Sequence, residues 1–373
     1  MAKTWSELYS QLAMGAKEKK EFIAGSFELT SRCNLRCKMC YVSHSAYDKH
    51  AKDKELTTAQ WIRLAEEARD TGLLFLTLTG GEVFLREDFK TLYEKFMNLG
   101  FLINIYTNGT LITPDIVNWL AAMPPSIVSV TLYGASRETY QKVTGLAGGY
   151  DKTISAIDNL LAKGIPTEIK TTVIQGNKKD FDQLYDFVQQ RNKALGVVNY
   201  VSPSREGSSD PCGNRLSPDE LLQYEIHMTK RDQEAAKKTG RKSISKIEDA
   251  VSEVNPIKNN FENHMKGSNF AFECMSGSCA GWVTWDGRLI PCGILDKPES
   301  NPLEIGFRRA WEDIKQKCLL IPVCKVCREC QYKSLCEKCP ARLYRETGHY
   351  DQPAPYLCEL AQKRIEYNKK STL

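Results

Sequence analysis

Three cysteines near the start of the chain are spaced for metal chemistry. Cys33, Cys37 and Cys40 lie four and then three residues apart in one short segment. Three thiolates that converge from a single loop can hold three irons of a [4Fe–4S] cube and leave the fourth iron without a protein ligand. That open iron suits an external chelating molecule. A zinc site normally takes a fourth protein ligand, which His44 or His50 could supply, so zinc is the alternative at this loop.

Most of the other cysteines lie near the carboxyl end. Of the 14 in the chain, ten fall between Cys274 and Cys358, and Cys212 stands alone. A chain of this size does not need disulfides as staples, and intracellular thiols stay reduced, so we expect these cysteines to bind metal. Two Cys-x2-Cys pairs, beginning at Cys327 and Cys336, would suit zinc ribbons as well as iron–sulfur clusters.

Polar and small residues follow three successive predicted strands. They are Gly80, Gly81, Glu82, Thr107, Asn108 and Thr131. Glycine lets a backbone approach a ligand closely, and the Glu82 carboxylate can accept hydrogen bonds from an ammonium group. Parallel strands end at one rim, so we expect these residues to lie together. A simple turn explains the Asn108-Gly109 pair equally well.

In combination, these motifs resemble the radical S-adenosylmethionine (SAM) superfamily, most clearly in the run Cys-Asn-Leu-Arg-Cys-Lys-Met-Cys-Tyr. The resemblance implies that SAM binds the open iron, takes one electron from a donor such as flavodoxin or ferredoxin, and releases a 5′-deoxyadenosyl radical that abstracts a hydrogen atom. It implies SAM contacts at Met39, Tyr41, Gly80, Gly81, Glu82, Thr107, Asn108 and Thr131.

The carboxyl-terminal cysteines resemble the SPASM extension of radical SAM peptide-modifying enzymes. One spacing differs from the usual pattern: two residues separate Cys336 from Cys339, where that pattern has three. The resemblance implies two auxiliary [4Fe–4S] clusters and so three in all. It assigns the first auxiliary cluster to Cys274, Cys279, Cys292 and Cys339. It assigns the second to Cys327, Cys330, Cys336 and Cys358, with Cys324 as an alternative ligand.

The same resemblance implies a peptide substrate. We expect hydrogen abstraction from a ribosomally made peptide, leading to a thioether or carbon–carbon cross-link, to epimerisation or to another oxidation. Related anaerobic sulfatase-maturating enzymes carry Asp directly after the hairpin cysteine, where this chain has Gly293, which disfavours that activity. Only 32 residues precede Cys33, so we expect a leader-peptide-binding protein to be separate. A small-molecule dehydrogenase or cofactor-biosynthesis enzyme is the alternative, and a non-catalytic zinc protein is a remote one.

A polar loop beyond the last predicted strand offers further candidates. Cys212 could donate a hydrogen atom to a substrate radical, and Asp210 could act as a base. Arg205 and Arg215 could clamp a carboxylate. An incidental cysteine and a solvated charged loop explain the same residues.

The elements that must position these residues alternate between strand and helix. Apolar, β-branched runs predict strands at 27–29, 74–79, 101–107, 127–132, 167–174 and 196–201, with amphipathic helices between them. Six such units predict an α/β fold, a partial (β/α)6 TIM-like barrel with a cysteine-rich iron–sulfur domain after it. A doubly wound sheet is the alternative.

We expect four segments along the chain. They are a helical extension at 1–24, the radical SAM partial barrel at 25–215, a helical bridge at 216–272 and the SPASM domain at 273–373. Within them, residues 217–238 and 307–316 are predicted helices, and the Asp286-Gly287 turn predicts a hairpin over 283–290.

Composition limits the remaining choices. The chain has 373 residues, 26% of them charged and 42% hydrophobic, which excludes disordered and fibrous classes. No apolar run approaches the 18 or so residues of a membrane span, and the N-terminus lacks the apolar core of a signal peptide. The net charge of +5 does not demand nucleic acid. We therefore expect a cytoplasmic enzyme without a membrane or nucleic-acid partner.

Overall fold

The computed structural model describes residues 5–42, 44–239 and 270–371. The chain divides into two compact units. The first comprises Met1–Asn214 and Met275–Cys318, and the second comprises Arg215–Cys274 and Leu319–Leu373. Most of the predicted helical bridge at 216–272 lies outside the described residues.

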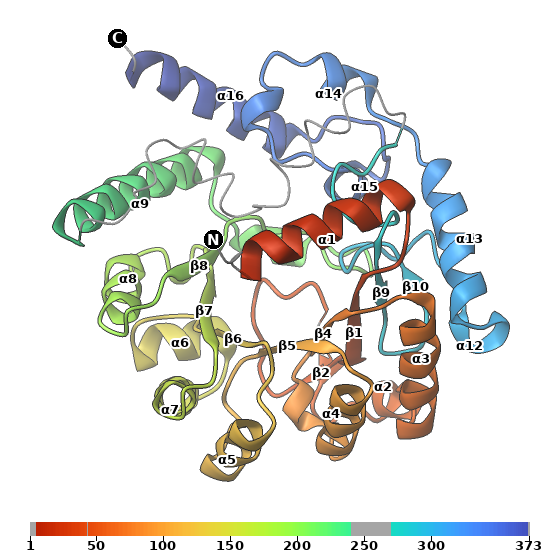
Figure 1. Ribbon diagram of the computed structural model, residues 1–373. Coiled ribbons are helices and arrows are strands. Elements are labelled where there is room, and N and C mark those ends of the chain that lie inside the picture. Colours follow the sequence, from red (N-terminus) through yellow and green to blue (C-terminus); the bar gives the residue numbers. More distant parts are fainter. Residues whose placement is uncertain (1–4, 43, 240–269, 372–373) are drawn as a thin grey trace. The chain divides into compact units, whose positions relative to one another are not determined.

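A curved parallel sheet forms the centre of the first unit (Figure 1). Its strands are β1 (Ala24–Thr30), β4 (Phe75–Gly80), β5 (Leu102–Thr107), β6 (Ile127–Thr131), β7 (Thr167–Thr172) and β8 (Leu195–Val198). They pair in parallel in exactly the order of the sequence. A doubly wound sheet would reverse its order at a switch point, so that alternative is excluded and the predicted succession of six strands is confirmed.

Helices connect these strands, and Figure 1 shows α3, α4, α5 and α7 on the outer side of the sheet. The helices of this region are α1 (Trp5–Lys19), α2 (Lys49–Lys54), α3 (Thr58–Thr71), η1 (Val83–Leu85), α4 (Phe89–Asn98), α5 (Pro114–Ala122), α6 (Arg137–Thr144), α7 (Gly149–Ala162) and α8 (Phe181–Gln189). Local signals fix their ends. Thr57 and Gln60 form a reciprocal capping box at α3, and Gly72 ends that helix with φ +119°.

The predicted hairpin is present and also extends the sheet. Strand β9 (Ala280–Val283) pairs antiparallel with β10 (Leu289–Ile290), as the Asp-Gly turn predicts. Strand β9 also pairs in parallel with β1, from Ala24 opposite Ala280 to Phe27 opposite Val283. The hairpin therefore belongs to the same sheet as the first thiol loop. It is followed by α12 (Pro302–Ile305) and α13 (Phe307–Leu319), which confirms the predicted helix there.

An aromatic core lies behind β1. The Phe27 ring lies 5.2 Å from Trp61 of α3 and 5.9 Å from Phe96 of α4, measured between centroids, and all three side chains are fully buried. Burying such side chains stabilises the fold by roughly 1.5–3 kcal/mol each. This buried aromatic packing therefore supports β1, at whose carboxyl end the thiol loop begins.

The second unit is helical where it is described. Its elements are α9 (Pro218–Thr239), α14 (Lys325–Glu329), η3 (Lys333–Leu335), α15 (Pro340–Thr347) and α16 (Pro355–Ser371). The fully buried Arg364 of α16 donates from Nε to Glu225 Oε2 of α9 at 2.8 Å and from Nη1 to the Leu335 carbonyl at 3.0 Å. This charge-assisted contact joins the two long helices. No helix among the described residues is long and apolar enough to cross a membrane.

Candidate active site

The first thiol loop begins where β1 ends. The short strands β2 (Arg32–Cys33) and β3 (His44–Ser45) pair in parallel and so close the base of the loop. The Arg36 backbone N–H donates to the Thr144 carbonyl at 2.7 Å, which docks the loop against the end of α6. The structure thus holds all three cysteines of the loop at the carboxyl end of the sheet.

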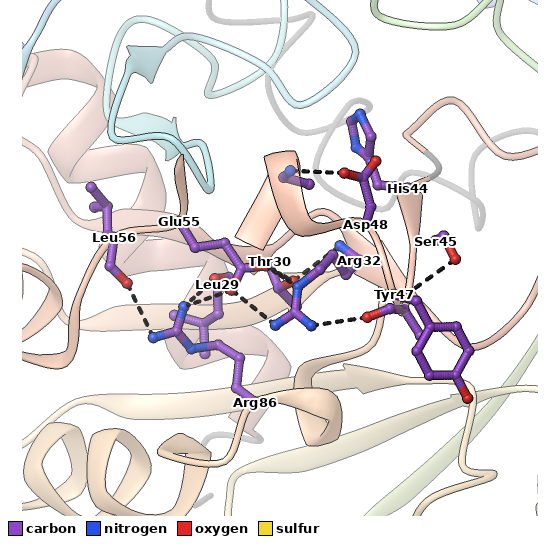
Figure 2. Close-up of polar contacts among 12 residues, drawn as sticks. Leu29, Thr30, Arg32, His44, Ser45, Tyr47, Asp48, Glu55, Leu56 and Arg86 are labelled. Carbon is purple, nitrogen blue, oxygen red and sulfur yellow. Dashed lines mark hydrogen bonds and ion pairs between the residues drawn. The ribbon is translucent and has the colours of Figure 1, made fainter. Parts of the chain in front are cut away.

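A buried group of charges supports this loop (Figure 2). Arg32 Nε donates to Glu55 Oε1 at 2.8 Å, and Arg86 Nη1 lies 3.5 Å from Glu55 Oε2. The Thr30 hydroxyl also contacts the Glu55 carboxylate. Arg86 also pairs with Asp88, because its Nη2 donates to Asp88 Oδ2 at 2.7 Å. Glu55 therefore ties the end of β1 to the segments that follow α2 and η1.

The three thiols lie within electrostatic reach of one another. Burial raises the pKa of Cys33 to about 12, with further increases from the charges of Glu82 and Cys40. Burial also raises the pKa of Cys37 and of Cys40. Thiolates in such a place need a cationic partner, and an iron–sulfur cluster provides one, so the donor set fits the expected group. Among the described residues, however, no three His, Cys, Asp or Glu side chains are arranged to hold a metal ion.

Glu82 is a buried carboxylate next to this loop. It is fully buried at the N-terminus of η1 and accepts hydrogen bonds from Thr107 Oγ1 at 2.7 Å and from the backbone N–H groups of Asn108 at 2.8 Å and Phe84 at 3.2 Å. Burial raises its pKa to about 7, although these bonds oppose the increase. Within the described part of the chain it forms no ion pair. An ammonium group is a partner that would suit such a buried carboxylate.

Gly80 and Gly81 are required by the chain itself. A Cβ at Gly80, which has φ +145°, would lie 2.2 Å from the Thr30 carbonyl oxygen, and one at Gly81 would lie 2.2 Å from the Arg32 carbonyl oxygen. The expected reason for these glycines was a close approach of a ligand. The structure shows that they let the end of β4 pack against the end of β1, which places Glu82 beside the thiol loop.

Asn108 links Glu82 to the first thiol. Its backbone N–H binds Glu82, and its Nδ2 lies 3.7 Å from Cys33 Sγ and 2.9 Å from Asn34 Oδ1. Thr107 binds Glu82 through its hydroxyl. Both residues therefore lie at the rim where the sequence predicts them.

The other predicted SAM contacts lie around the same rim. Met39 is buried against Val143, Ile174 and Val201, and Cys37 and Tyr133 pack against this apolar cluster. Tyr41 lines a cavity described next. Thr131 is the last residue of β6 and is half-buried. Their roles toward SAM stay predictions.

A cavity of about 530 Å³ lies next to the thiol loop in the first unit. Cys40 and Tyr41 line it together with basic and acidic side chains, among them Lys54, Arg205, Arg288, Glu206, Asp210 and Asp286. Asp210, at the start of η2 (Asp210–Asn214), is thus placed where a base would be useful. Cys212 is not among the lining residues, and its Sγ lies 3.8 Å from the Val201 carbonyl oxygen. Hydrogen donation by Cys212 stays a prediction.

Arg205 connects two cysteine segments within the first unit. Its guanidinium pairs with Glu28 of β1, with Nη2 2.7 Å from Oε2, and its Nε donates to the Gly293 carbonyl at 2.9 Å. The Arg205 backbone N–H donates to the Tyr41 carbonyl at 3.0 Å, and Trp282 Nε1 donates to Glu28 at 2.8 Å. Arg205 therefore does clamp a carboxylate, but one from its own chain. Sequence reasoning missed Glu28, whose only signal is a charged residue inside a buried strand.

Five thiols gather in the second unit. Burial raises the pKa of Cys327 to about 12, and Cys324, Cys336 and Cys358 raise it further. Burial also raises the pKa of Cys358, with smaller increases from the charges of Cys330 and Cys324. The structure thus brings Cys324 to the predicted second auxiliary group and does not choose among the five. Arg215, the other candidate carboxylate clamp, pairs with Glu346 in this unit, with Nη1 2.5 Å from Oε1.

The four residues predicted for the first auxiliary cluster are divided between the units. Cys274 and Cys339 belong to the second unit. Burial raises the pKa of Cys339, and the charge of Cys274 adds a smaller increase. Cys279 and Cys292 belong to the first unit, where Cys279 is fully buried. All fourteen cysteines fall within the described residues. The assignment of this cluster stays a prediction.

Known proteins share these sequence features. The family model described as the radical SAM superfamily matches residues 27–188. AdoMet-dependent heme synthase of Methanosarcina barkeri is 27% identical, over 89% of this chain and 95% of that protein. Fe-coproporphyrin III synthase of the same organism is 30% identical, over 97% and 93%. The sporulation killing factor maturation protein SkfB of Bacillus subtilis is 26% identical, over 76% and 63%.

A solved structure shows the same fold. The structure of native anSMEcpe with bound AdoMet and Cp18Cys peptide matches with a TM-score of 0.70 and 18% identity, over 94% of this chain and 97% of that chain. At this identity the match concerns the fold alone. It confirms the α/β architecture expected from the strand and helix pattern.

Proposed function

Because the chain belongs to the radical SAM superfamily, we propose that Cys33, Cys37 and Cys40 hold a [4Fe–4S] cluster at which SAM is cleaved reductively. The cluster, when bound, supplies the electron that releases a 5′-deoxyadenosyl radical, which then takes a hydrogen atom from the substrate. The observation that carries the proposal is the placement of three partly buried thiols beside a buried carboxylate that has no cationic partner in the described structure.

The chain's own residues prepare this chemistry. Glu82 receives the amino group of SAM, and Thr107 together with the Asn108 backbone holds the carboxylate in place. Met39 brings apolar surface next to Cys37, which excludes water from the reacting region. The protein therefore binds, orients and dries the site, while the cofactor performs the bond cleavage.

We propose a peptide as the substrate, and the character of the cavity supports this. Both cationic and anionic side chains line its volume of about 530 Å³, among them Lys54 and Arg288 and, of the opposite charge, Glu206 and Asp210. Such a lining suits the mixed polar groups of a peptide better than a broad apolar ring. The similarity to the peptide-maturing protein SkfB agrees with this choice.

A carboxylated tetrapyrrole is the second candidate. It is favoured by the two Methanosarcina barkeri relatives, which match nearly the whole chain and are named for heme and Fe-coproporphyrin III synthesis. The basic residues of the cavity could receive its carboxylates, although Arg205 and Arg288 already have acidic partners.

The remaining parts of the proposal concern clusters and partners. Residues 273–373 would form the SPASM domain and hold two auxiliary clusters on the cysteines predicted above, so that the chain carries three. A flavodoxin or ferredoxin would supply the electron, and a separate protein would present the leader of a peptide substrate. The cytoplasm would keep the thiols reduced.

The initiation chemistry is tested by replacing Cys33, Cys37 and Cys40 with Ala. Under strong reductant the parent protein should form 5′-deoxyadenosine from SAM, and the triple variant should form none. Cys212→Ala is the matched control, because it removes a thiol of the same unit that we do not assign to a cluster, and it should still form 5′-deoxyadenosine. Retained formation in the triple variant would refute the proposal.

The substrate class is tested by stimulation of the same reaction. We expect 5′-deoxyadenosine formation to rise when peptides encoded beside the gene are added, with a matching mass change in one peptide. Fe-coproporphyrin III is the competing addition. Stimulation by the tetrapyrrole, with a change in the mass of the tetrapyrrole and no change in any peptide, would select the second candidate.

A further inference from the structure

Two side chains at the rim lie beside sulfurs of the first thiol loop. Asn108, just beyond β5, places Nδ2 3.7 Å from Cys33 Sγ. Tyr133, just beyond β6, packs with Cys37 against one apolar cluster. Burial raises the pKa of Cys37, and the Tyr133 side chain opposes that increase. A backbone donor also reaches Cys33, from the Leu35 N–H at 3.3 Å. The two side chains come from neighbouring strands and lie beside two different thiols.

The orientation of the Asn108 amide is fixed by its neighbours. Its Oδ1 accepts from the Thr110 backbone N–H at 2.9 Å and from the Thr110 hydroxyl at 2.6 Å. Since the oxygen is occupied by two donors, Nδ2 must be the atom that faces Cys33 and Asn34. Asn34 Nδ2 in turn donates to Thr110 Oγ1 at 2.8 Å, which closes a ring of contacts. Asn108 and Thr110 are almost completely buried, so the donor is held in place.

Tyr133 is held equally firmly. Its ring packs with Cys37 against the apolar cluster that contains Met39 and Ile174. The Tyr140 ring meets it edge-on with centroids 6.2 Å apart, and Asn177 Nδ2 donates to the Tyr133 carbonyl at 3.1 Å. The Tyr133 ring therefore has little freedom to turn.

We propose that Asn108 and Tyr133 set the reduction potential of the cluster carried by Cys33, Cys37 and Cys40. Hydrogen bonds to ligand sulfurs stabilise the reduced cluster, which carries one more negative charge, and so raise its potential. Because the same Asn108 backbone binds Glu82, the tuning residue is also connected to the site for the SAM amino group. The inference rests on the proposed function, since it requires a cluster on these thiols.

The test is Tyr133→Phe, which removes one hydroxyl and keeps the ring. The reduced-cluster electron paramagnetic resonance signal that responds to added SAM is followed against applied potential, which separates this cluster from any other. Tyr133→Phe should keep its iron and shift the midpoint to a more negative potential. Tyr140→Phe is the control, because its buried hydroxyl bonds Thr153 Oγ1 at 2.9 Å and not a sulfur. Its midpoint should not move.

A second pair of variants tests the other donor. Asn108→Asp keeps the oxygen that Thr110 requires and removes the donor to Cys33, so its midpoint should also become more negative. Asn104→Asp makes the same change earlier in β5 and should leave the midpoint unchanged.

The outcomes separate the two proposals. Unchanged midpoints in Tyr133→Phe and Asn108→Asp, or equal shifts in their controls, would overturn this inference. Loss of the cluster from both variants would assign them a purely structural role and would overturn it as well. If only Tyr133→Phe loses its iron, the comparison of the midpoints of Asn108→Asp and Asn104→Asp tests the inference. Absence of any SAM-responsive signal in the parent protein would instead refute the proposed function.

Discussion

At the scale of single residues, we expect the buried carboxyl of Glu82 to set a lower pH limit for SAM binding. Burial raises its pKa to about 7, so the group is a carboxylate above pH 7 and a neutral acid below it. A neutral acid cannot balance an ammonium group. We expect the affinity for SAM to be highest above pH 7 and to fall, by up to about tenfold per pH unit, as the pH drops through 7. Equilibrium dialysis with labelled SAM on the anaerobic holoprotein measures this.

The control for this prediction is Glu82→Gln. It should bind SAM weakly and with no pH step in the same range, because it has no charge to lose. Cys33, whose pKa is influenced by Glu82, is proposed as a cluster ligand in the holoprotein and should not contribute a step. An affinity that stays constant below pH 7 in the parent protein would contradict the assignment of Glu82.

At the scale of elements, the Arg32–Glu55–Arg86 group predicts a strong coupling between the thiol loop and the segment after α2 (Figure 2). Glu55→Gln leaves two nearly buried guanidinium groups without their shared charge. Breaking a buried pair in this way costs about 3–5 kcal/mol of the free energy of unfolding. Urea denaturation of the anaerobic protein measures it.

A matched surface pair provides the comparison. Asp151 lies 2.8 Å from Arg137, and both side chains are at least half exposed. Asp151→Asn should cost less than about 1 kcal/mol, because solvent screens the pair. Equal effects of the two substitutions would show that Glu55 does not anchor the loop.

The elements also show what the sequence could and could not reveal. Apolar runs and capping residues such as Thr57 predict the six strands and their helices, because burial and helix ends leave local signals. The pairing of β9 with β1 leaves none, since parallel partners 256 residues apart share no turn. For the same reason, the sequence pointed to Glu82 from its place after a strand, but Glu28 and Tyr133 became visible only when distant segments met.

At the scale of the whole molecule, the proposal requires three clusters on one chain. Anaerobic reconstitution should give about 12 irons per chain, four for each cube. Replacing Cys33, Cys37 and Cys40 by Ala should lower this to about eight and remove the SAM-responsive signal. Replacing Cys327, Cys330, Cys336 and Cys358 should also leave about eight but should keep that signal, because those thiols belong to the other compact unit. Cys212→Ala should retain all 12. Bound zinc without iron in the parent protein would show that the thiols serve structure and not catalysis, and four irons in total would restrict the chain to the first thiol loop.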